Sequence, residues 1–311
     1  QGGDTKFMRE EQVTFITGAS RGFGLATAHE LARRGHPVVS TMRNPERDGE
    51  AAIGEFSDLI SVTQCDVTDD DSVAQAVDFA HQLHGRVDAV FNNAGYGLYG
   101  PVEELQDEEV QRQFDTNVGG QIRVVRHVMP HMRKQGHGKI INVASLAGRV
   151  SSPLMGLYAA SKHAVEAVTV ALRFEAEAAG IDVTILEPGM YVSDWQYGSL
   201  DVTQAVREGR SCMQAVVDET LEAFRAVALT RPGSQAVAIA VADIIGLEQR
   251  LPMRWPVGED TAQGIETLRT TTDATWEELM RNSVGPSGVF AQASQKASEG
   301  TQQRGWTTPR W

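Results

Sequence analysis

The chain has 311 residues, of which 41% are hydrophobic, and it carries a formal net charge of −13. This length and apolar content suit one large α/β domain with an extension. The acidic balance excludes proteins that bind nucleic acid or anionic lipid through a basic surface. The 2 cysteines show neither a disulfide framework nor metal-ligand spacing, and no apolar run has transmembrane length. We therefore expect a cytoplasmic protein without a membrane span or a bound metal.

Apolar runs and helical periodicity predict alternating strands and helices up to residue 188. The apolar runs predict buried strands at residues 13–17, 37–41, 59–65, 87–91, 140–143 and 182–186. Helical spacing predicts helices at residues 22–34, 69–83, 107–134 and 157–179, the third kinked by Pro130. This alternation predicts right-handed βαβ units, and therefore a doubly wound parallel sheet of the Rossmann-like α/β class.

The last third of the chain has a different pattern. Helices are expected at residues 199–229, 234–249 and 261–281, with a last strand at 253–257. We expect a single domain over residues 8–285 that ends in a C-terminal helical extension, followed by a polar tail over 286–311. Residues 1–7 are polar and are interpreted as a leftover expression segment ahead of a native start at Met8.

A glycine-rich loop, TGASRGFG over residues 17–24, joins the first predicted strand to the first helix. Gly18 permits a tight turn, Gly22 lets the backbone approach a pyrophosphate, and Gly24 allows close packing of helix and strand. The N-terminus of the helix would then face the phosphate charge. An ordinary glycine turn is the alternative, but the position between strand and helix favours a dinucleotide site.

The end of the second predicted strand indicates which dinucleotide binds. NAD sites commonly place an acidic side chain there, which accepts a hydrogen bond from the ribose 2′-hydroxyl. Here the sequence reads STMR over residues 40–43, with no acid before Glu46. Arg43 can bind a 2′-phosphate through its planar fork of donors, and Arg21 lies in the glycine loop near the same place. We therefore predict NADP(H) as the cofactor, with a solvated arginine pair as the alternative.

Together with further motifs, these features resemble the short-chain dehydrogenase/reductase family, in particular its branch of 17β-hydroxysteroid and retinol dehydrogenases. The resemblance covers about residues 11–260. Its motifs are TGASRGFG at 17–24, CDV at 65–67, NNAG at 92–95, DTNVGG at 115–120, NVASLAG at 142–148, YAASK at 158–162 and EPG at 187–189. It implies a sheet of seven strands, and a homodimer or homotetramer built on the two long helices.

The resemblance also implies which residues bind the cofactor. They would border the adenine, line the central trough and meet the nicotinamide end. The expected set is Gly18, Ser20, Arg21, Gly22, Phe23, Gly24, Arg43, Asp66, Val67, Asn93, Ala94, Gly95, Tyr158, Lys162, Pro188, Gly189, Val192 and Ser193. Family members more often carry threonine at the position of Ser193, and serine keeps the hydroxyl.

Tyr158 is predicted to be the acid/base of a hydride-transfer reaction. Reducing a ketone leaves an oxyanion that must be protonated, and an ordinary phenol with a pKa of about 10 is poorly matched to neutral pH. Lys162 lies four residues later on the same helix face, and its charge would lower the pKa of the phenol, as would an oxidised nicotinamide. Ser145 can donate a hydrogen bond to the substrate oxygen. Asn117 resembles the family residue that supports a water link from Lys162 to solvent.

Ligands of open α/β sheets bind beyond the carboxyl ends of the strands. The residues expected there are large, apolar and soft, which suits a bulky hydrophobic ketone or secondary alcohol such as a steroid, retinoid or polyketide-like ring. The predicted substrate residues are Tyr96, Leu146, Leu154, Met155, Met190, Tyr191 and Trp195, with a lid at about 190–215. The alternative is that half of them fill the core beneath the lid.

Two other functions are compatible with the same fold. An NADP(H)-binding regulatory protein would bind the cofactor without turnover. An epimerase or dehydratase would keep the cofactor through a reaction with no net oxidation. Since neither Tyr158 nor Lys162 is replaced, we favour a ketoreductase or alcohol dehydrogenase.

Overall fold

The computed structural model describes residues 11–192 and 198–283. A parallel sheet of seven strands forms its centre, in the order β3-β2-β1-β4-β6-β7-β9. The strands are β1 (Thr14–Ile16), β2 (Val38–Met42), β3 (Ile60–Gln64), β4 (Ala89–Asn92), β6 (Gly138–Val143), β7 (Ile181–Pro188) and β9 (Arg254–Val257). The strand order reverses its direction between β1 and β4, as in a doubly wound sheet. The predicted Rossmann-like α/β fold is therefore confirmed.

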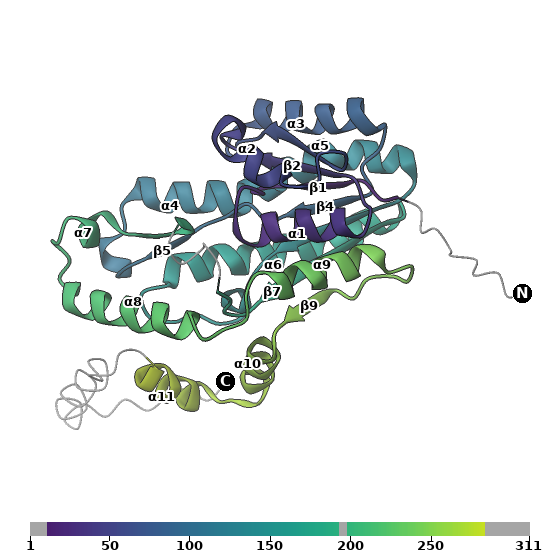
Figure 1. Ribbon diagram of the computed structural model, residues 1–311. Coiled ribbons are helices and arrows are strands. Elements are labelled where there is room, and N and C mark those ends of the chain that lie inside the picture. The colour runs from purple at the N-terminus through teal and green to yellow at the C-terminus, as the bar shows by residue number, and fades with distance from the viewer. Residues whose placement is uncertain (1–10, 193–197, 284–311) are drawn as a thin grey trace, which may run out of the picture.

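Helices cover both faces of this sheet (Figure 1). On one face, α1 (Gly22–Arg33) packs against α9 (Gln235–Gly246), with α2 (Pro45–Ile53) beside them. On the other face lie α3 (Asp70–His84), α5 (Gly120–Gln135) and α6 (Gly156–Glu177). None of the helices that the structure describes combines the length and the apolar character needed to cross a membrane.

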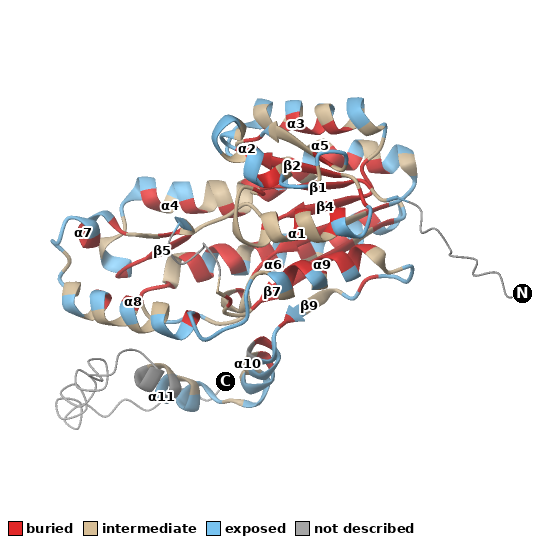
Figure 2. Ribbon diagram, viewed as in Figure 1, coloured by how far each residue is buried: buried red, intermediate tan, exposed pale blue. Residues whose placement is uncertain are grey.

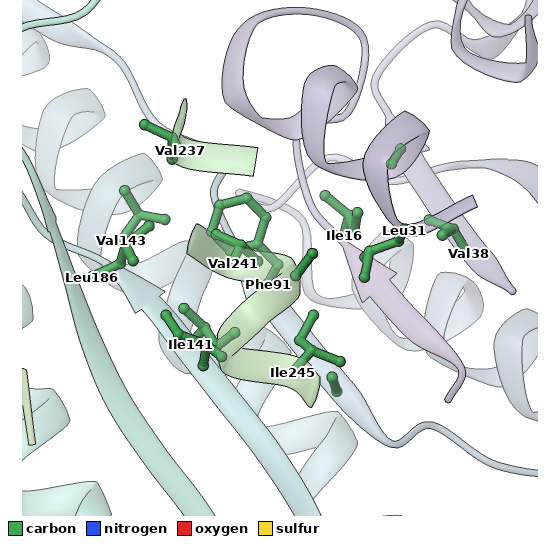
Figure 3. Packing of buried hydrophobic residues seen from close by; sticks show 14 of the residues in the cluster. Ile16, Leu31, Val38, Phe91, Ile141, Val143, Leu186, Val237, Val241 and Ile245 are labelled. Carbon is green, nitrogen blue, oxygen red and sulfur yellow. The ribbon is translucent and has the colours of Figure 1, made fainter. Parts of the chain in front are cut away.

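Each face of the sheet has its own hydrophobic core, which explains why the strand segments read as continuous apolar runs. Phe15 packs on the α3–α5 side, whereas its neighbour Ile16 packs on the α1–α9 side. Figure 3 shows the core on the α1–α9 side, where Phe91 and Ile141 of the sheet lie against Val241 of α9. Figure 2 shows that buried residues gather on the strands and on the helix sides that face them.

The long helix predicted at residues 107–134 is interrupted near its middle. It consists of α4 (Asp107–Phe114), a five-residue π turn η2 (Asp115–Gly119) and α5. Pro130 lies inside α5, which continues to Gln135. A π turn widens the helix by one residue, and such turns occur often at functional sites. Here the turn carries Asn117.

Two elements were missed by the sequence reasoning although one of them carries a local signal. Asn44 caps α2 by accepting a hydrogen bond from the backbone N–H of Arg47 at 3.1 Å, and Pro45 occupies the first helical position. The other, β5 (Gly97–Tyr99), pairs in parallel with β8 (Leu200–Val202) in a separate small sheet. That partner is distant in the sequence, so no local pattern predicts the pairing.

Two predictions for the C-terminal third are wrong. Residues 199–213 are not one helix, because β8 takes its backbone hydrogen bonds from β5, and only the short α7 (Gln204–Arg207) precedes α8 (Gln214–Ala228). The helix expected at 261–281 is split into α10 (Glu259–Thr270) and α11 (Asp273–Ser283). Thr271 is extended, and the Thr272 hydroxyl accepts a hydrogen bond from the N–H of Thr275, which starts the second helix.

Candidate active site

A cavity of about 1150 Å³ lies beyond the carboxyl ends of the central strands. It runs from the glycine loop between β1 and α1 to β8, which pairs with β5, and to α8, at the lower left of Figure 1. The predicted cofactor residues that line it are Gly18, Ser20, Arg21, Gly22, Phe23, Arg43, Asp66, Val67, Asn93, Ala94, Gly95, Tyr158, Lys162, Pro188 and Gly189. Gly24 and Val192 do not line it, and Ser193 lies outside the described residues.

The predicted substrate residues are divided between two places. Those that line the cavity are Tyr96, Leu146, Met155, Met190 and Tyr191. Leu154 instead lines a second, smaller cavity beside α11, and Trp195 lies outside the described residues. Leu154 has a φ of 66°, and this left-handed conformation is unusual for a residue other than glycine.

The three glycines of the first loop differ in what surrounds them. Gly18 has a φ of 67°, and a Cβ there would lie 3.0 Å from the Cα of Ala94. A Cβ on Gly24 would collide with the carbonyl oxygen of Gly18, so this glycine lets α1 pack closely against the turn. Gly22 has a φ of 57°, and no described atom lies within 4 Å of its Cβ position. Its backbone is therefore open to the cavity.

The N-terminus of α1 is suited to an anion. Its N-cap is Arg21, no described side chain caps its backbone N–H groups, and its first turn contains no acidic residue. These N–H groups and the positive end of the helix dipole therefore remain available for a phosphate. This position therefore suits a pyrophosphate.

The expected 2′-phosphate site has two arginines and no acid at the end of β2. Arg21 and Arg43 both line the cavity. The pKa of Asp48 is lowered chiefly by its hydrogen bond with Arg47, and Arg21 and Arg43 contribute through their charges. The guanidinium of Arg21 also lies against Gly198 of the lid. Both cations therefore act on the same carboxylate, that of Asp48.

The NNAG segment is tied to the glycine loop by hydrogen bonds. The Thr17 hydroxyl accepts from the backbone N–H groups of Asn93 and Ala94, both at 3.0 Å. The Asn93 amide donates to the carbonyl oxygens of Thr17 and Gly18 at 2.9 and 3.1 Å. These bonds hold two walls of the cavity at a constant separation.

Tyr158, Lys162 and Ser145 meet at the floor of the cavity. Tyr158 and Lys162 are one turn apart on α6 and are 8% and 4% exposed, and the Lys162 Nζ lies 5.7 Å from the centre of the Tyr158 ring. Lys162 donates a hydrogen bond to the carbonyl oxygen of Val143 at 2.9 Å. Ser145 follows β6, and its side chain hydrogen-bonds with Tyr158. Three residues far apart in the sequence therefore surround one part of the cavity.

The expected lowering of the phenol pKa by Lys162 is wrong for the protein by itself. Burial raises the pKa of Tyr158 to about 12, and the hydrogen bond with Ser145 opposes this rise. Burial also lowers the pKa of Lys162 to about 8. Removal from water disfavours the charged form of each group, and burial is the largest cause of both shifts.

Asn117 holds the segment beneath Tyr96 and does not line the cavity. Its Oδ1 accepts from the N–H of Tyr96 at 3.0 Å, and its Nδ2 donates to the Tyr96 carbonyl at 2.9 Å and to the Ser161 hydroxyl at 3.0 Å. The Cβ position of Gly95 lies 3.0 Å from this Oδ1 and 3.8 Å from the Lys162 Nζ. Asn117 is thus close to Lys162, and the expected water link stays a prediction.

A polar cluster that the sequence reasoning missed closes the substrate end. Arg112 of α4 donates to the Tyr96 hydroxyl at 3.1 Å and pairs with Asp201 of β8, also at 3.1 Å. Asp201 pairs in addition with Arg207 at 2.5 Å. Arg112 and Asp201 both line the cavity, but they are 89 positions apart, so no motif links them. Further lining residues that were missed include Tyr99, Thr220, Phe224, Val227 and Arg231.

A comparison with models of known protein families shows which family the chain is related to. A family model described as short chain dehydrogenase matches residues 12–200. The chain belongs to the short-chain dehydrogenase/reductase family. The resemblance inferred from the motifs is therefore confirmed at the level of the family, which is one of oxidoreductases.

Individual members of the family are similar over most or part of the chain. Oxidoreductase BOA17 of Botryotinia fuckeliana is 33% identical, over 86% of this chain and 97% of the relative. The 3-ketodihydrosphingosine reductase of Bacteroides thetaiotaomicron is 41% identical, over 58% of this chain and 64% of the relative. The solved structure of a short-chain dehydrogenase/reductase from Burkholderia phymatum in complex with NAD is 29% identical. It covers 89% of this chain and 97% of its own, with a TM-score of 0.71.

Proposed function

We propose that the protein transfers a hydride between NADP(H) and a bulky hydrophobic ketone or secondary alcohol, with Tyr158 as the acid/base. The observation that carries this proposal is the meeting of Tyr158, Lys162 and Ser145 in one cavity with the uncapped N-terminus of α1. A regulatory protein without turnover would not need a buried phenol and a buried ammonium beside a serine hydroxyl at this place. Family membership supports an oxidoreductase.

The cofactor would be held by the protein groups already described. The N-terminus of α1 and Gly22 would bind the pyrophosphate, Arg21 and Arg43 the 2′-phosphate, and Gly189 would lie at the nicotinamide end. When bound, the nicotinamide supplies or accepts the hydride and, in its oxidised form, adds a positive charge near the phenol. The relative from Burkholderia phymatum binds NAD, so the choice of NADP(H) rests on the two arginines of this chain.

Tyr158 and its neighbours would manage the proton of the reaction. The phenol donates its proton to the oxygen of a reduced carbonyl, and it removes a proton from an alcohol in the reverse direction. Ser145 donates a hydrogen bond to the same oxygen and holds it near the phenol. Lys162 is suited to relay protons near neutral pH because burial lowers its pKa to about 8.

The substrate class is proposed from the lining of the cavity. Leu146, Met155, Phe224 and Val227 surround the part between Tyr158 and the lid with apolar surface. Such a lining favours a large apolar ligand that carries one polar carbonyl or hydroxyl group. The name of the relative from Bacteroides thetaiotaomicron, a reductase of a ketone, agrees with this class of reaction.

A screen for NADPH oxidation tests the proposed function. Loss of NADPH absorbance, equal in amount to the alcohol formed, is expected with steroidal, aromatic or polyketide-like ketones. Conversion of a substrate with no net loss of NADPH would instead identify an epimerase or dehydratase. NADPH binding without turnover of any carbonyl compound would favour the regulatory function, and preference for small polar sugars would contradict the substrate class.

Replacing Arg43 with aspartate is expected to reverse the cofactor preference. Loss of charge-assisted hydrogen bonds to the 2′-phosphate should weaken NADPH binding about tenfold to 100-fold, while the new carboxylate can accept from the ribose of NADH. Binding titrations with both nucleotides measure the change. Arg47→Asp is the matched control, because Arg47 carries the same charge on α2 but does not line the cavity. Unchanged preference in Arg43→Asp would contradict the assignment.

The predicted homodimer or homotetramer can be tested on the exposed sides of the two long helices. Ile122 on α5 and Val168 and Phe174 on α6 are exposed apolar side chains, and Phe174 is 61% exposed. Phe174→Asp is expected to shift the mass measured by light scattering toward the monomer, since a charge would enter the apolar contact. Leu83→Asp on α3, outside these helices, should leave the mass unchanged. A monomeric natural protein would contradict the prediction.

A further inference from the structure

Two glutamates from different elements face each other behind the active site. Glu187, near the end of β7, is 0% exposed, and Glu166 on α6 is 6% exposed. Each of the two carboxyl groups lies within 4.0 Å of the same two guanidiniums, those of Arg149 and Arg254. Arg254 of β9 donates to Glu166 at 2.9 Å, and Arg149 lies 3.4 Å from Glu187. The group is therefore a compact cluster of two carboxyls and two guanidiniums.

A proton on Glu187 explains this contact between two acids. Among the described residues, neither carboxyl oxygen of Glu187 accepts a hydrogen bond from a protein donor. Burial and the charge of Glu166 raise the pKa of Glu187 to about 7, although Arg149 and Arg254 oppose the rise. Two ionised carboxylates so close would repel each other, whereas a protonated Glu187 can donate a hydrogen bond to Glu166.

On one side the cluster connects the serine loop to the catalytic helix. Arg149 directly follows η3 (Leu146–Gly148), which begins after Ser145. Glu166 lies one turn beyond Lys162 on α6. The two elements are packed tightly there, since a Cβ on Gly148 would lie 3.1 Å from the Glu166 side chain. A shift of this carboxyl group would therefore move the loop that carries Ser145 relative to the helix that carries Lys162.

On the other side the cluster reaches the proposed nicotinamide end of the cavity. Glu187 directly precedes Pro188 and Gly189, and both of these residues line the cavity. Arg254 belongs to β9, which pairs with β7, and it lies 4.0 Å from Glu187. The three segments that form this end of the cavity therefore meet at one pair of carboxyl groups.

We propose that Glu187 and Glu166 share one proton, and that this shared proton holds the Ser145 loop, helix α6 and the turn after β7 in the geometry of hydride transfer. Glu187 is thus a positioning residue that acts through Ser145, Lys162 and Gly189. This role rests on the proposed function, whereas the sharing of the proton does not. When the proton is lost, the two carboxylates repel each other and the three segments separate.

Several charged side chains lie around Glu166 and Glu187 and affect the pH at which the shared proton is lost. In the described part of the chain, Arg149 comes from the segment after η3 and Arg254 from β9. Lys162 is on the same helix as Glu166, but its ammonium is directed to the Val143 carbonyl. The proton lost near pH 7 is therefore the one held by Glu187.

Infrared difference spectroscopy tests the shared proton without any substrate. The natural protein should show the C=O stretch of a buried protonated carboxyl below pH 7, and the band should vanish as the pH rises above that value. Glu187→Gln should lack this band at every pH. A band that persists in Glu187→Gln, or one that is absent from the natural protein, would overturn the proposal.

Thermal unfolding gives a second measurement that is independent of turnover. The folded-state pKa of Glu187 is raised from 4.5 to about 7, so the native state holds this proton more tightly than the unfolded chain. The natural protein therefore loses stability as the pH rises through this window, whereas Glu187→Gln does not. The Tm of the variant relative to the natural protein should rise across the window and stay constant above it. Parallel curves would contradict the shared proton.

Kinetics with a ketone from the NADPH screen test the positioning role. Glu187→Ala should lower kcat about 100-fold with a smaller change in KM, because misplacement of the reacting groups affects the chemical step. Glu187→Gln should restore kcat to within a factor of about three, since its amide can donate to Glu166. The kcat of the natural protein is expected to decline above pH 7, and that of Glu187→Gln is not.

Asp88→Asn is the matched control for a buried carboxyl. Asp88 is 5% exposed and accepts from the N–H of Val13, and it pairs with Arg86 before β4, away from the cavity lining. The control should lower the Tm but leave kcat unchanged. Equal values of kcat in Glu187→Ala and Asp88→Asn would overturn the positioning role. A failed screen would contradict the proposed function alone, because the infrared band and the unfolding curves need no substrate.

Discussion

Replacing Tyr158 with phenylalanine should lower kcat about a thousandfold, because general acid–base catalysis contributes factors of this size. The substitution removes only the hydroxyl group, and the ring would stay packed at the floor of the cavity, where the side chain is 8% exposed. NADPH binding should therefore remain within a factor of about three of the natural protein. Steady-state kinetics and a binding titration measure the two effects separately.

The separation of the two effects identifies the role of the hydroxyl group. A parallel loss of kcat and of NADPH affinity would mean that the phenol mainly shapes the binding site. Turnover near that of the natural protein would contradict the acid/base role of Tyr158. Ser145→Ala provides a graded comparison, since it removes a hydrogen bond to the substrate oxygen but leaves the proton donor in place, and it should have a smaller effect than Tyr158→Phe.

Replacing Lys162 with methionine should abolish most of the activity and yet stabilise the protein at neutral pH. Burial lowers the pKa of Lys162 from 10.5 to about 8, which corresponds to about 3 kcal/mol of unfavourable burial of the charge. Methionine has no charge to bury, but it leaves the Val143 carbonyl without its donor, which costs about 1–2 kcal/mol. The net gain in the free energy of unfolding should be about 1–2 kcal/mol.

The pH dependence of this gain has a definite sign. Between pH 8 and 10.5 the unfolded chain holds the lysine proton more tightly than the native state, so the natural protein gains stability as the pH rises. The advantage of Lys162→Met should therefore be full below pH 8 and vanish between pH 8 and 10.5. Above pH 10.5 the variant should be less stable by about 1–2 kcal/mol, because the Val143 carbonyl still lacks its donor. Denaturant unfolding at several pH values measures it. A loss of stability at neutral pH would show that the lysine holds the fold together.

A matched control separates the function of Lys162 from general damage to its helix. His163 is the next residue on α6, and its Nδ1 lies 2.9 Å from the carbonyl oxygen of Ala159 on the same helix. It does not line the cavity. His163→Gln should keep kcat, whereas Lys162→Met should lower kcat at least about 100-fold. If both variants lost activity equally, the integrity of the helix rather than the ammonium would explain the loss.

The local features of this chain were predictable from the sequence because their causes are local. The strand at Thr14–Ile16 is buried on both faces, so every residue in it is hydrophobic or small. The glycine loop can be recognised in the sequence because Gly18 and Gly24 occupy positions where a Cβ would clash, so glycine is required there. Tyr158 and Lys162 were found together because one helical turn separates them.

The features that escaped prediction depend on contacts between distant residues. The pairing of β5 with β8 and the ion pair between Arg112 and Asp201 both join segments that are far apart in the chain. The direction in which the pKa of Tyr158 shifts depends on how much water reaches the phenol. The spacing of residues along a helix does not reveal how far a side chain is buried. The contact between Glu166 and Glu187 likewise needs the folded sheet.

The number of residues in the π turn between α4 and α5 sets how the side chains of α4 are rotated relative to those of α5. Each residue of an α-helix advances the chain by about 100° around the axis, so one residue more or less would rotate everything on α4 relative to α5. Arg112 would then turn away from Asp201, while α5 stayed seated on the sheet. A deletion of a single residue within Asp115–Gly119 would thus rotate α4 relative to α5. The ion pair between Arg112 of α4 and Asp201 of β8 would then be lost, although both side chains were still present.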